Sequence, residues 1–197
     1  MKQIKRLQGI LIACSVALGG TAVAATPSGS MLGNTCAGCH GTNGNSNGPA
    51  TPTIAGISSE YFIETMEGYK KGERTSTIMT RIAKGYTEEE IKLMADFFAK
   101  QKFTRLPQKA DAKMAKRGKK LHDKYCEKCH EDGGRSTEDD AGILAGQWKP
   151  YLKYTMDDFM SGGREMSKKM KKKVDSLKKS KGDKGLEQLY HYYASQK

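Results

Sequence analysis

Two short stretches of the sequence carry the same reactive residues at the same spacing. Each has two cysteines three positions apart and a histidine directly after the second cysteine: Cys36, Cys39 and His40 in "NTCAGCHGTNG", and Cys126, Cys129 and His130 in "DKYCEKCHEDGG". Cysteines at i and i+3 lie on one face of a helical turn, where their thiols can form thioethers with the two vinyl groups on one porphyrin edge. The histidine that follows is then turned under the ring and can bind the iron. The sequence therefore predicts two covalently bound heme c groups.

Two other occupants of the cysteine pairs compete with heme. A thioredoxin-like redox pair requires a βαβ surround, and the flanks of both motifs lack the alternation typical of strands. A zinc ion requires all its donors to face one small ion, but neighbours such as Cys129 and His130 point about 100° apart on a helix. Zinc and redox thiols are therefore the weaker alternatives.

The beginning of the chain has the pattern of a signal peptide. Three basic residues within positions 2–6 precede an apolar stretch at 9–21, and Ala22-Val23-Ala24 matches a small-residue cleavage site. The apolar stretch is too short to predict a membrane span. We expect residues 1–24 to direct export into the bacterial periplasm and then to be removed, which leaves a mature chain without a transmembrane segment.

Cleavage after residue 24 also determines which cysteines remain. It removes Cys14 and three cations but no anion, so the mature chain keeps four cysteines and its formal charge falls from +12 to +9. All four belong to the two CxxCH motifs, so none is left for a structural disulfide, and bare pairs would tend to oxidise in the periplasm. The alternative is a lipoprotein in which "LIAC" at 11–14 is the processing site and Cys14 carries a lipid anchor.

The two motifs belong to an internal repeat with an offset of 90 residues. The other matches are Ala55-Gly56 with Ala145-Gly146, Tyr61 with Tyr151, Thr65-Met66 with Thr155-Met156, Gly72 with Gly162, and Arg74 with Arg164. Such self-similarity indicates a duplicated domain. We expect a first domain at 25–102, a linker at 103–112 and a second domain at 113–197. Domains this small are marginal by themselves, and a buried porphyrin would complete the core of each.

The second ligand of each iron is sought among the methionines. Met79 follows His40 by 39 residues, and Met170 follows His130 by 40. Met166 is the rival in the second domain, at 36 residues after its histidine. The agreement in spacing favours His/Met ligation by Met79 and Met170.

Other methionines and histidines have structural interpretations. Met66 and Met156 occur in "YFIETMEGY" and "YLKYTMDDF", which are apolar at helical spacing, so we expect both in the core. His122, four residues before Cys126, and His191, near the C-terminus, are expected to be surface or packing residues.

The rest of the pattern predicts an all-α fold. "YTEEEIKLMADFFAKQ" begins with Thr87 and Glu90 at capping-box spacing, and a corresponding helix is expected from about Asp183. The loop "GTNGNSNGPATPTIAG" is too rich in Gly, Asn and Pro for a helix or strand. A carbonyl near Pro49 in this loop is expected to accept the ring N–H of His40. The equivalent stretch of the second domain has no proline, so its proximal side should be built differently.

These stretches also resemble a known family. The first half matches it in "CAGCHGTNGNSNGPATPTIAG" and "STIMTRIAKGY", and the second half in "LHDKYCEKCHEDGG", "ILAGQWKPYL" and a terminal "YYASQ". The mature chain is similar to the diheme cytochrome subunit of flavocytochrome c sulfide dehydrogenase. The resemblance implies two tandem cytochrome c-type heme domains, with irons bound by His40 and Met79 and by His130 and Met170. It also implies a heterodimer with a separate FAD-containing subunit that oxidises sulfide and passes electrons to the hemes.

The chemistry of the expected ligands independently favours an electron carrier. Methionine ligation tends to raise a heme potential, and an iron with both axial positions filled offers no site to a substrate. We therefore expect a subunit without a catalytic site of its own, which passes electrons from the FAD-containing subunit to an external acceptor. The alternative is a free-standing cytochrome c4-type diheme carrier to a terminal oxidase. A diheme peroxidase would need one iron that opens, which two methionine ligands disfavour.

Nine lysines are concentrated between positions 168 and 184. Export argues against nucleic acid as their partner, and no aromatic residues are interleaved with them for base stacking. The run is either a solvated face or a docking surface for a soluble, acidic electron acceptor. The sequence leaves both interpretations open.

Overall fold

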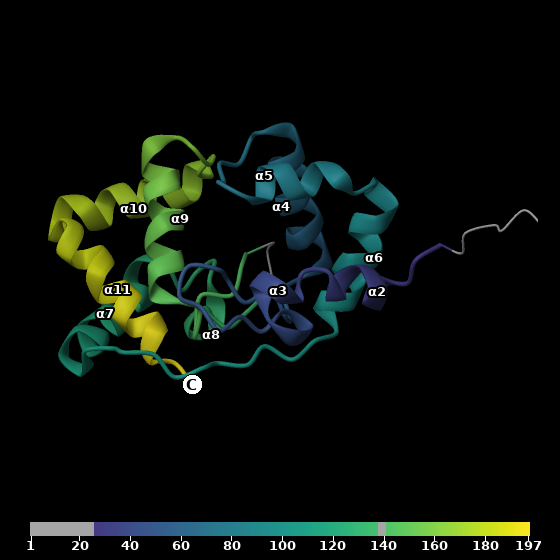
Figure 1. Cartoon of the computed structure of the whole chain (residues 1–197). Coiled ribbons are helices and arrows are strands. Elements are labelled where there is room, and N and C mark those ends of the chain that lie inside the picture. Colours follow the sequence, from purple (N-terminus) through teal and green to yellow (C-terminus); the bar gives the residue numbers. More distant parts are fainter. Residues whose placement is uncertain (1–25, 138–140) are drawn as a thin grey trace, which may run out of the picture.

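The computed structural model describes residues 26–137 and 141–197, in which two groups of helices lie side by side (Figure 1). We call the segment with helices α2 to α6 the first copy and the segment with α7 to α11 the second copy. Residues 102–111 contain no helix and connect the two copies along one side of the molecule. The expected signal peptide at 1–24, with Cys14, lies outside the described residues.

The first copy contains five α-helices and two 3-10 turns within its described residues. In chain order they are α2 (Gly29–Asn34), α3 (Ala37–His40), η1 (Thr42–Gly44), α4 (Ser59–Lys71), α5 (Met79–Ile82), η2 (Ala83–Gly85) and α6 (Glu88–Ala99). Helices α2 and α4 both pack against α6. The CxxCH motif ends in α3, and Met79 is the first residue of α5.

The second copy repeats this order with two longer helices. Its helices are α7 (Ala112–Tyr125), α8 (Glu131–Gly134), α9 (Lys149–Ser161), α10 (Lys168–Lys181) and α11 (Asp183–Ser195). The first of the longer helices is α7, with 14 residues where α2 has six. Helix α9 has the same length as α4 and the same offset of 90 residues, but α10 has 14 residues where α5 has four. The methionine-bearing element has therefore been lengthened in the second copy.

Local signals in the sequence explain where the helices begin and end. The side chain of Thr87 accepts the N–H of Glu90, whose carboxylate accepts the N–H of Thr87, so the expected capping box is confirmed at the start of α6. Helices α4 and α9 both end at a glycine with a positive φ, Gly72 and Gly162. These repeat-related glycines occupy the left-handed conformation that closes a helix at low cost. Helix α11 begins at Asp183, as expected.

Each copy has an apolar core of its own. In the first, Ile91, Met94 and Phe98 of α6 are buried against Phe62 and Met66 of α4. The second core is formed where α7 lies along α11, and its buried members include Leu121, Leu186, Leu189, Tyr190 and Tyr193. Burial of Met66 confirms it as a core residue, and Met156 packs at the edge of the second core.

Reciprocal contacts join the two copies. Arg164 of the second copy donates from Nη2 to the hydroxyl of Tyr61 at 3.3 Å, and Arg74 of the first copy donates from Nη2 to the hydroxyl of Tyr151 at 3.5 Å. The two arginines also form an antiparallel backbone bridge, and the N–H of Thr75 donates to the Gly163 carbonyl at 2.8 Å. Because Tyr61 and Tyr151, like Arg74 and Arg164, are equivalent by the repeat, each copy gives the other the same pair of groups.

The all-α fold expected from the sequence is confirmed. No strand forms in residues 26–137 and 141–197, where the single bridge pair is the only extended pairing. Within the same ranges, every helix is too short or too polar to cross a membrane.

Candidate functional site

Both CxxCH motifs form one turn of helical hydrogen bonds. The carbonyl of Cys36 accepts the N–H groups of Cys39 and His40 at 3.2 and 2.8 Å. In the second copy the carbonyl of Cys126 accepts the N–H groups of the equivalent cysteine and histidine at 3.1 and 3.0 Å. The two cysteines of each motif are therefore presented from one turn, as thioether attachment to a single porphyrin edge requires.

His40 is buried and held by a backbone carbonyl. Its Nδ1 lies 2.9 Å from the carbonyl oxygen of Pro52, to which the ring N–H donates. The expected acceptor in this loop is confirmed, and it is the carbonyl of Pro52, three residues after Pro49. Burial lowers the pKa of His40, although the bond to Pro52 opposes this. The ring is thus kept neutral, with Nε2 left to bind a metal.

His130 has a different environment, as the missing proline of its loop suggested. Its Nδ1 is buried and has no hydrogen-bond partner in the part of the chain that the structure describes, which omits residues 138–140. Burial, together with the nearby His122 and Arg164, lowers its pKa to about 4. His130 is therefore a neutral imidazole as well, but without the carbonyl that orients His40.

The first cysteine of each motif lacks the lowered pKa of a redox-active thiol. Cys36, Cys39, Cys126 and Cys129 are all free. Burial raises the pKa of Cys36, and it raises the pKa of Cys126 to about 11. Redox-active thiols instead have lowered pKa values that favour the thiolate. Within residues 26–137 and 141–197, no three His, Cys, Asp or Glu side chains converge as donors for a metal ion such as zinc.

The two candidate methionines share a local bond that the sequence reasoning missed. Ser76 Oγ accepts the N–H of Met79 at 3.0 Å, and Ser167 Oγ accepts the N–H of Met170 at 3.2 Å. The signal is present in the sequence as a serine three residues before each methionine, in "STIM" and "SKKM". Both methionines are half-buried, and each lies in the first turn of its helix, three residues after the serine that accepts its N–H.

The same serines locate the extra residue of the second copy. Arg74 is two residues before Ser76, whereas Arg164 is three residues before Ser167. The insertion therefore lies at Glu165 and Met166, between the arginine that contacts the other copy and the serine that caps α10. Met166 is half-buried, but it has no counterpart in the first copy.

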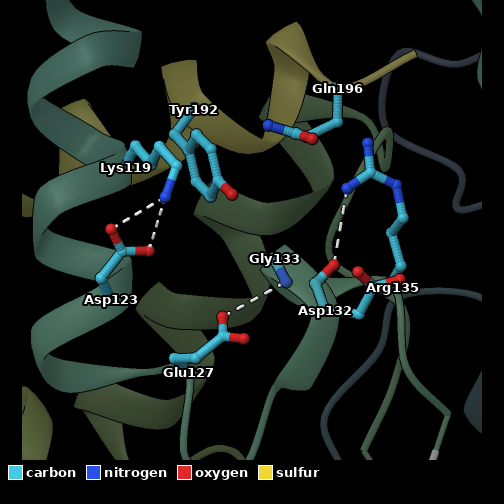
Figure 2. A pocket seen from close by; sticks show the side chains of 8 residues that line it. All are labelled: Lys119, Asp123, Glu127, Asp132, Gly133, Arg135, Tyr192 and Gln196. Atoms are coloured by element: carbon cyan, nitrogen blue, oxygen red, sulfur yellow. Dashed lines mark hydrogen bonds and ion pairs between the residues drawn. The ribbon is translucent and has the colours of Figure 1, made fainter.

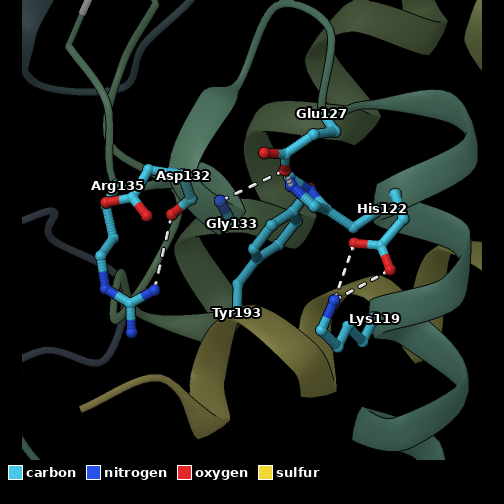
Figure 3. Close-up of polar contacts among 8 residues, drawn as sticks. Lys119, His122, Glu127, Asp132, Gly133, Arg135 and Tyr193 are labelled. Carbon is cyan, nitrogen blue, oxygen red and sulfur yellow. Dashed lines mark hydrogen bonds and ion pairs between the residues drawn. The ribbon is translucent and has the colours of Figure 1, made fainter.

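His122 is fully buried, and it is a packing residue rather than a surface one (Figure 3). Its Nδ1 lies 2.9 Å from the hydroxyl of Tyr193 in α11, and its Nε2 contacts the carboxylate of Glu127. The same carboxylate accepts the N–H of Gly133 at 3.2 Å. This cluster fastens the second CxxCH turn between α7 and α11. His191 is likewise structural, since its Nδ1 accepts the N–H of Asp111 at 2.8 Å.

A hollow of about 320 Å³ opens beside this cluster (Figure 2). Its lining residues are Lys119, Asp123, Glu127, Asp132, Gly133, Arg135, Tyr192 and Gln196. Lys119 and Asp123 pair with each other at 2.9 Å, and Glu127 is already bonded to Gly133. Three of its charged side chains are therefore already engaged, and the cysteines, histidines and methionines of the proposed ligand sets are absent from its lining, so the hollow is not the candidate site.

The surfaces around the two methionines differ in chemistry. In the first copy Ile78 and Ile82 flank Met79 and are 52% and 40% exposed. The corresponding side of α10 carries exposed lysines at positions 168, 169, 171, 172 and 173. Val174 and Leu177 hold the opposite side of α10 in the second copy. One equivalent element thus presents an apolar surface in the first copy and a basic surface in the second.

The residues present fit heme c in each copy. Each copy offers two thiols on one turn, a buried neutral imidazole directly after them, and a serine-capped methionine 39 or 40 residues later. Thiols, imidazole and thioether are the donors that attach and ligate this group. The Nδ1 of His130 is a buried nitrogen of this set that lacks a hydrogen-bond partner among the described residues.

Comparison with known proteins extends this picture. The family model described as cytochrome c matches residues 28–102. The cytochrome subunit of sulfide dehydrogenase from Chlorobaculum tepidum is 53% identical over 70 residues, which cover 36% of this chain and 63% of that protein. Cytochrome c4 from Pseudomonas aeruginosa is 30% identical over 139 residues, which cover 66% of this chain and 68% of the relative.

A solved structure matches more of the chain. The crystal structure of reduced recombinant cytochrome c4 from Pseudomonas stutzeri superposes with a TM-score of 0.74 at 25% identity, over 86% of this chain and 97% of that one. The likeness extends through both copies, so the side-by-side arrangement of the copies is shared as well.

Proposed function

This chain belongs to the cytochrome c family, in the diheme group that includes cytochrome c4, and we propose that it carries one heme c in each copy. The observation that supports the count of two is the repetition of the full donor set, from the CxxCH turn to the serine-capped methionine. When bound, heme c supplies a center that accepts and releases one electron. The protein is an electron carrier, and two such centers match the pair of electrons that a flavin releases.

We propose His40 and Met79 as the axial ligands in the first copy, and His130 and Met170 in the second. The thiols of Cys36 and Cys39, and of Cys126 and Cys129, attach the two groups. The proposed domains are residues 25–102 and 113–197, joined by 103–112. The equal bonds of Ser76 and Ser167 to the two methionines support this assignment, as does the position of Met166 inside an insertion.

In this proposal the chain's own residues bind the hemes, orient their ligands and shield them from water. These residues carry out no bond chemistry. Burial keeps the imidazoles of His40 and His130 neutral. The Pro52 carbonyl orients the first ring. The apolar cores around Phe98 and Tyr193 keep water from the two sites. If the histidine and the methionine of each copy both bound its iron, no position would remain there for a substrate.

We propose that the partner which supplies electrons is an FAD-containing sulfide dehydrogenase subunit. The 53% identity to the Chlorobaculum tepidum cytochrome subunit supports this partner. The alternative, a free-standing carrier of the cytochrome c4 type, is supported by the longer match to cytochrome c4. Affinity purification of the mature chain from its own cells separates the two, because a flavoprotein copurifies in stoichiometric amount only in the first case.

The proposed location is the periplasm, reached by cleavage of residues 1–24. The alternative is a lipid anchor on Cys14. For electron output, we propose that the lysines of α10 form the docking surface for a soluble, acidic acceptor. Their exposure supports this surface, as does the small number of acidic partners: among the described residues Lys171 pairs with Asp175 and Lys178 with Asp183.

Intact-mass analysis tests the cofactor proposal. The mature protein, extracted with acid and acetone, is expected to retain the mass of two hemes. Cys36→Ala combined with Cys39→Ala should remove one heme and leave the other, and the same change at Cys126 and Cys129 should remove only the second. Retention of one heme by the unaltered protein would contradict the proposal.

A further inference from the structure

The loop that holds His40 is itself held by the second copy. Gln147 is 3% exposed, and its amide makes two hydrogen bonds with the backbone of Thr53, which is also buried. Its Oε1 accepts the N–H of Thr53 at 3.0 Å, and its Nε2 donates to the carbonyl of Thr53 at 2.9 Å. Thr53 directly follows Pro52, whose carbonyl accepts the ring N–H of His40.

Trp148 holds the other end of the same loop. Its Nε1 donates to the carbonyl of Ser46 at 3.1 Å. The ring lies directly on Gly48, where a Cβ atom would come within 2.4 Å of it. Ser46 is buried, and its hydroxyl donates to the Thr51 carbonyl at 2.7 Å and accepts the N–H of Gly48 at 2.9 Å. Gln147 and Trp148 of the second copy therefore hold residues 46–53 at both ends, a set of contacts that we call the grip.

The residues of the first copy at the equivalent positions make no such bonds. By the repeat, the counterparts of Gln147 and Trp148 are Ile57 and Ser58. Ile57 packs in the core of the first copy, and Ser58 caps α4 through the N–H of Tyr61. The first copy meets the equivalent stretch of the second through other residues, since the ring of Tyr61 lies against Gly142 and Ile143 packs in the core of the first copy. The hydrogen bonds of Gln147 and Trp148 are thus specific to the loop that holds His40.

We infer that Gln147 and Trp148 are positioning residues for His40: by fixing loop 46–53 they fix the Pro52 carbonyl, and so set the electron-donating strength of the first iron's histidine. This inference rests on the proposed ligation by His40. A hydrogen bond from Nδ1–H to an acceptor raises the basicity of a ligating imidazole, and bonds around the ligands tune the potential of a heme. The second copy therefore tunes the first heme without touching it.

The test compares three variants of the full-length holoprotein, each first shown by mass to carry two hemes. Gln147→Leu keeps the bulk but loses both bonds to Thr53, and Trp148→Phe keeps a ring on Gly48 but loses the bond to Ser46. Gln108→Ala is the matched control. Gln108 bonds the backbone of Gln147 and Lys149 from the linker at 2.9 Å each, so its loss disturbs the same turn but leaves loop 46–53 gripped.

Two measurements follow the loop and the iron separately. Proton NMR should show exchange of the His40 Nδ1–H about tenfold faster in Gln147→Leu, the factor for a loss of ~1.4 kcal/mol. Redox titration should show the first heme shifted to a more positive potential, with a smaller shift in Trp148→Phe and none in Gln108→Ala. The first heme is identified as the one whose potential changes in Met79→Ala. The second heme should keep its potential in all three variants.

Three results would overturn the inference. The first is a Gln147→Leu protein with two hemes whose first potential and His40 exchange are unchanged. The second is an equal shift of both hemes, and the third is a shift of the same size in Gln108→Ala. If the unaltered protein lacks two hemes, the proposed function fails instead, and this is known before any variant is titrated.

Discussion

Met166 lies before the first residue of α10 and Met170 lies within it, and the bonds of single residues favour Met170. Ser167 accepts the N–H of Met170 as Ser76 accepts that of Met79. Met166 lies in the stretch that has an extra residue relative to the first copy. Ser167, which separates the two methionines, has a non-helical backbone, so Met166 precedes the helix and lacks the position that Met170 has in it.

We expect Met170→Ala to remove about half of the sulfur-to-iron charge-transfer band, because the two hemes contribute comparably. The potential of the second heme should fall in the same variant. Met166→Ala is the matched control and should leave both properties unchanged, and Met79→Ala should remove the other half of the band. Absorption spectra of the oxidised protein and a redox titration provide the measurements. Loss of the band in Met166→Ala alone would reverse the assignment.

Spacing within one copy could be read from the sequence, but contacts between copies could not. The CxxCH turns, the capping box of α6 and the core position of Met66 depend on neighbours three or four residues away, and all were predictable. The carbonyl for His40 was expected near Pro49 and is that of Pro52, because composition marks a loop but not the residue at which it turns back. The role of Gln147 could not be predicted, because its partner Thr53 is 94 residues away. The repeat also has isoleucine at the position equivalent to Gln147.

At the scale of elements, α5 and α10 are equivalent helices with different surfaces. Ile78 and Ile82 are exposed beside Met79, whereas exposed lysines occupy the same side of α10. Charge that lies near a redox center raises the rate of encounter with a partner of opposite charge, and salt screens it. The lengthening of α10 was not foreseen, since the lysine run has helical propensity but an almost wholly polar pattern.

Charge reversal tests the docking role of α10. Lys171, Lys172 and Lys173 changed together to Glu should slow electron transfer to an acidic acceptor by about tenfold or more at low salt. Transfer by the unaltered protein should slow in the same way as ionic strength rises to the physiological value. Stopped-flow oxidation of the reduced protein measures both rates.

The matched control reverses three exposed lysines of α7, at positions 113, 116 and 120. This variant has the same net charge but keeps α10 intact, so it should lose much less of the rate. If neither salt nor either triple substitution changes the rate, the lysines of α10 form a solvated face and not a docking surface.

At the scale of the molecule, the reciprocal bonds between Arg164 and Tyr61 and between Arg74 and Tyr151 hold the copies together. Burial alone would raise the pKa of Tyr61, but the guanidinium groups of Arg74 and Arg164 lower it to about 8. The two guanidinium groups thus stabilise the charged form of the Tyr61 phenol. The repeat revealed that these four residues correspond, but only the structure shows that they pair crosswise.

Tyr61→Phe should lower the free energy of unfolding by about 1.5 kcal/mol, the low end for a hydrogen bond to a charged group. Tyr151→Phe should cost less, because its bond to Arg74 is longer, at 3.5 Å. Tyr154→Phe is the control, since Tyr154 is 56% exposed and should change stability little. Denaturant titration of the holoprotein measures all three, and equal stability of Tyr61→Phe and Tyr154→Phe would contradict the expectation.

The crosswise pairs have the form of a self-complementary contact, the kind by which two identical subunits associate around a twofold axis. In such a homodimer every substitution appears twice, so the two halves cannot acquire different surfaces. The connection through residues 102–111 removes that constraint, because each copy can then change alone. Only a fused pair can hold differences between its halves. Here α10 has lysines and α5 has none, and Gln147 bonds a loop of the other copy whereas its counterpart Ile57 does not.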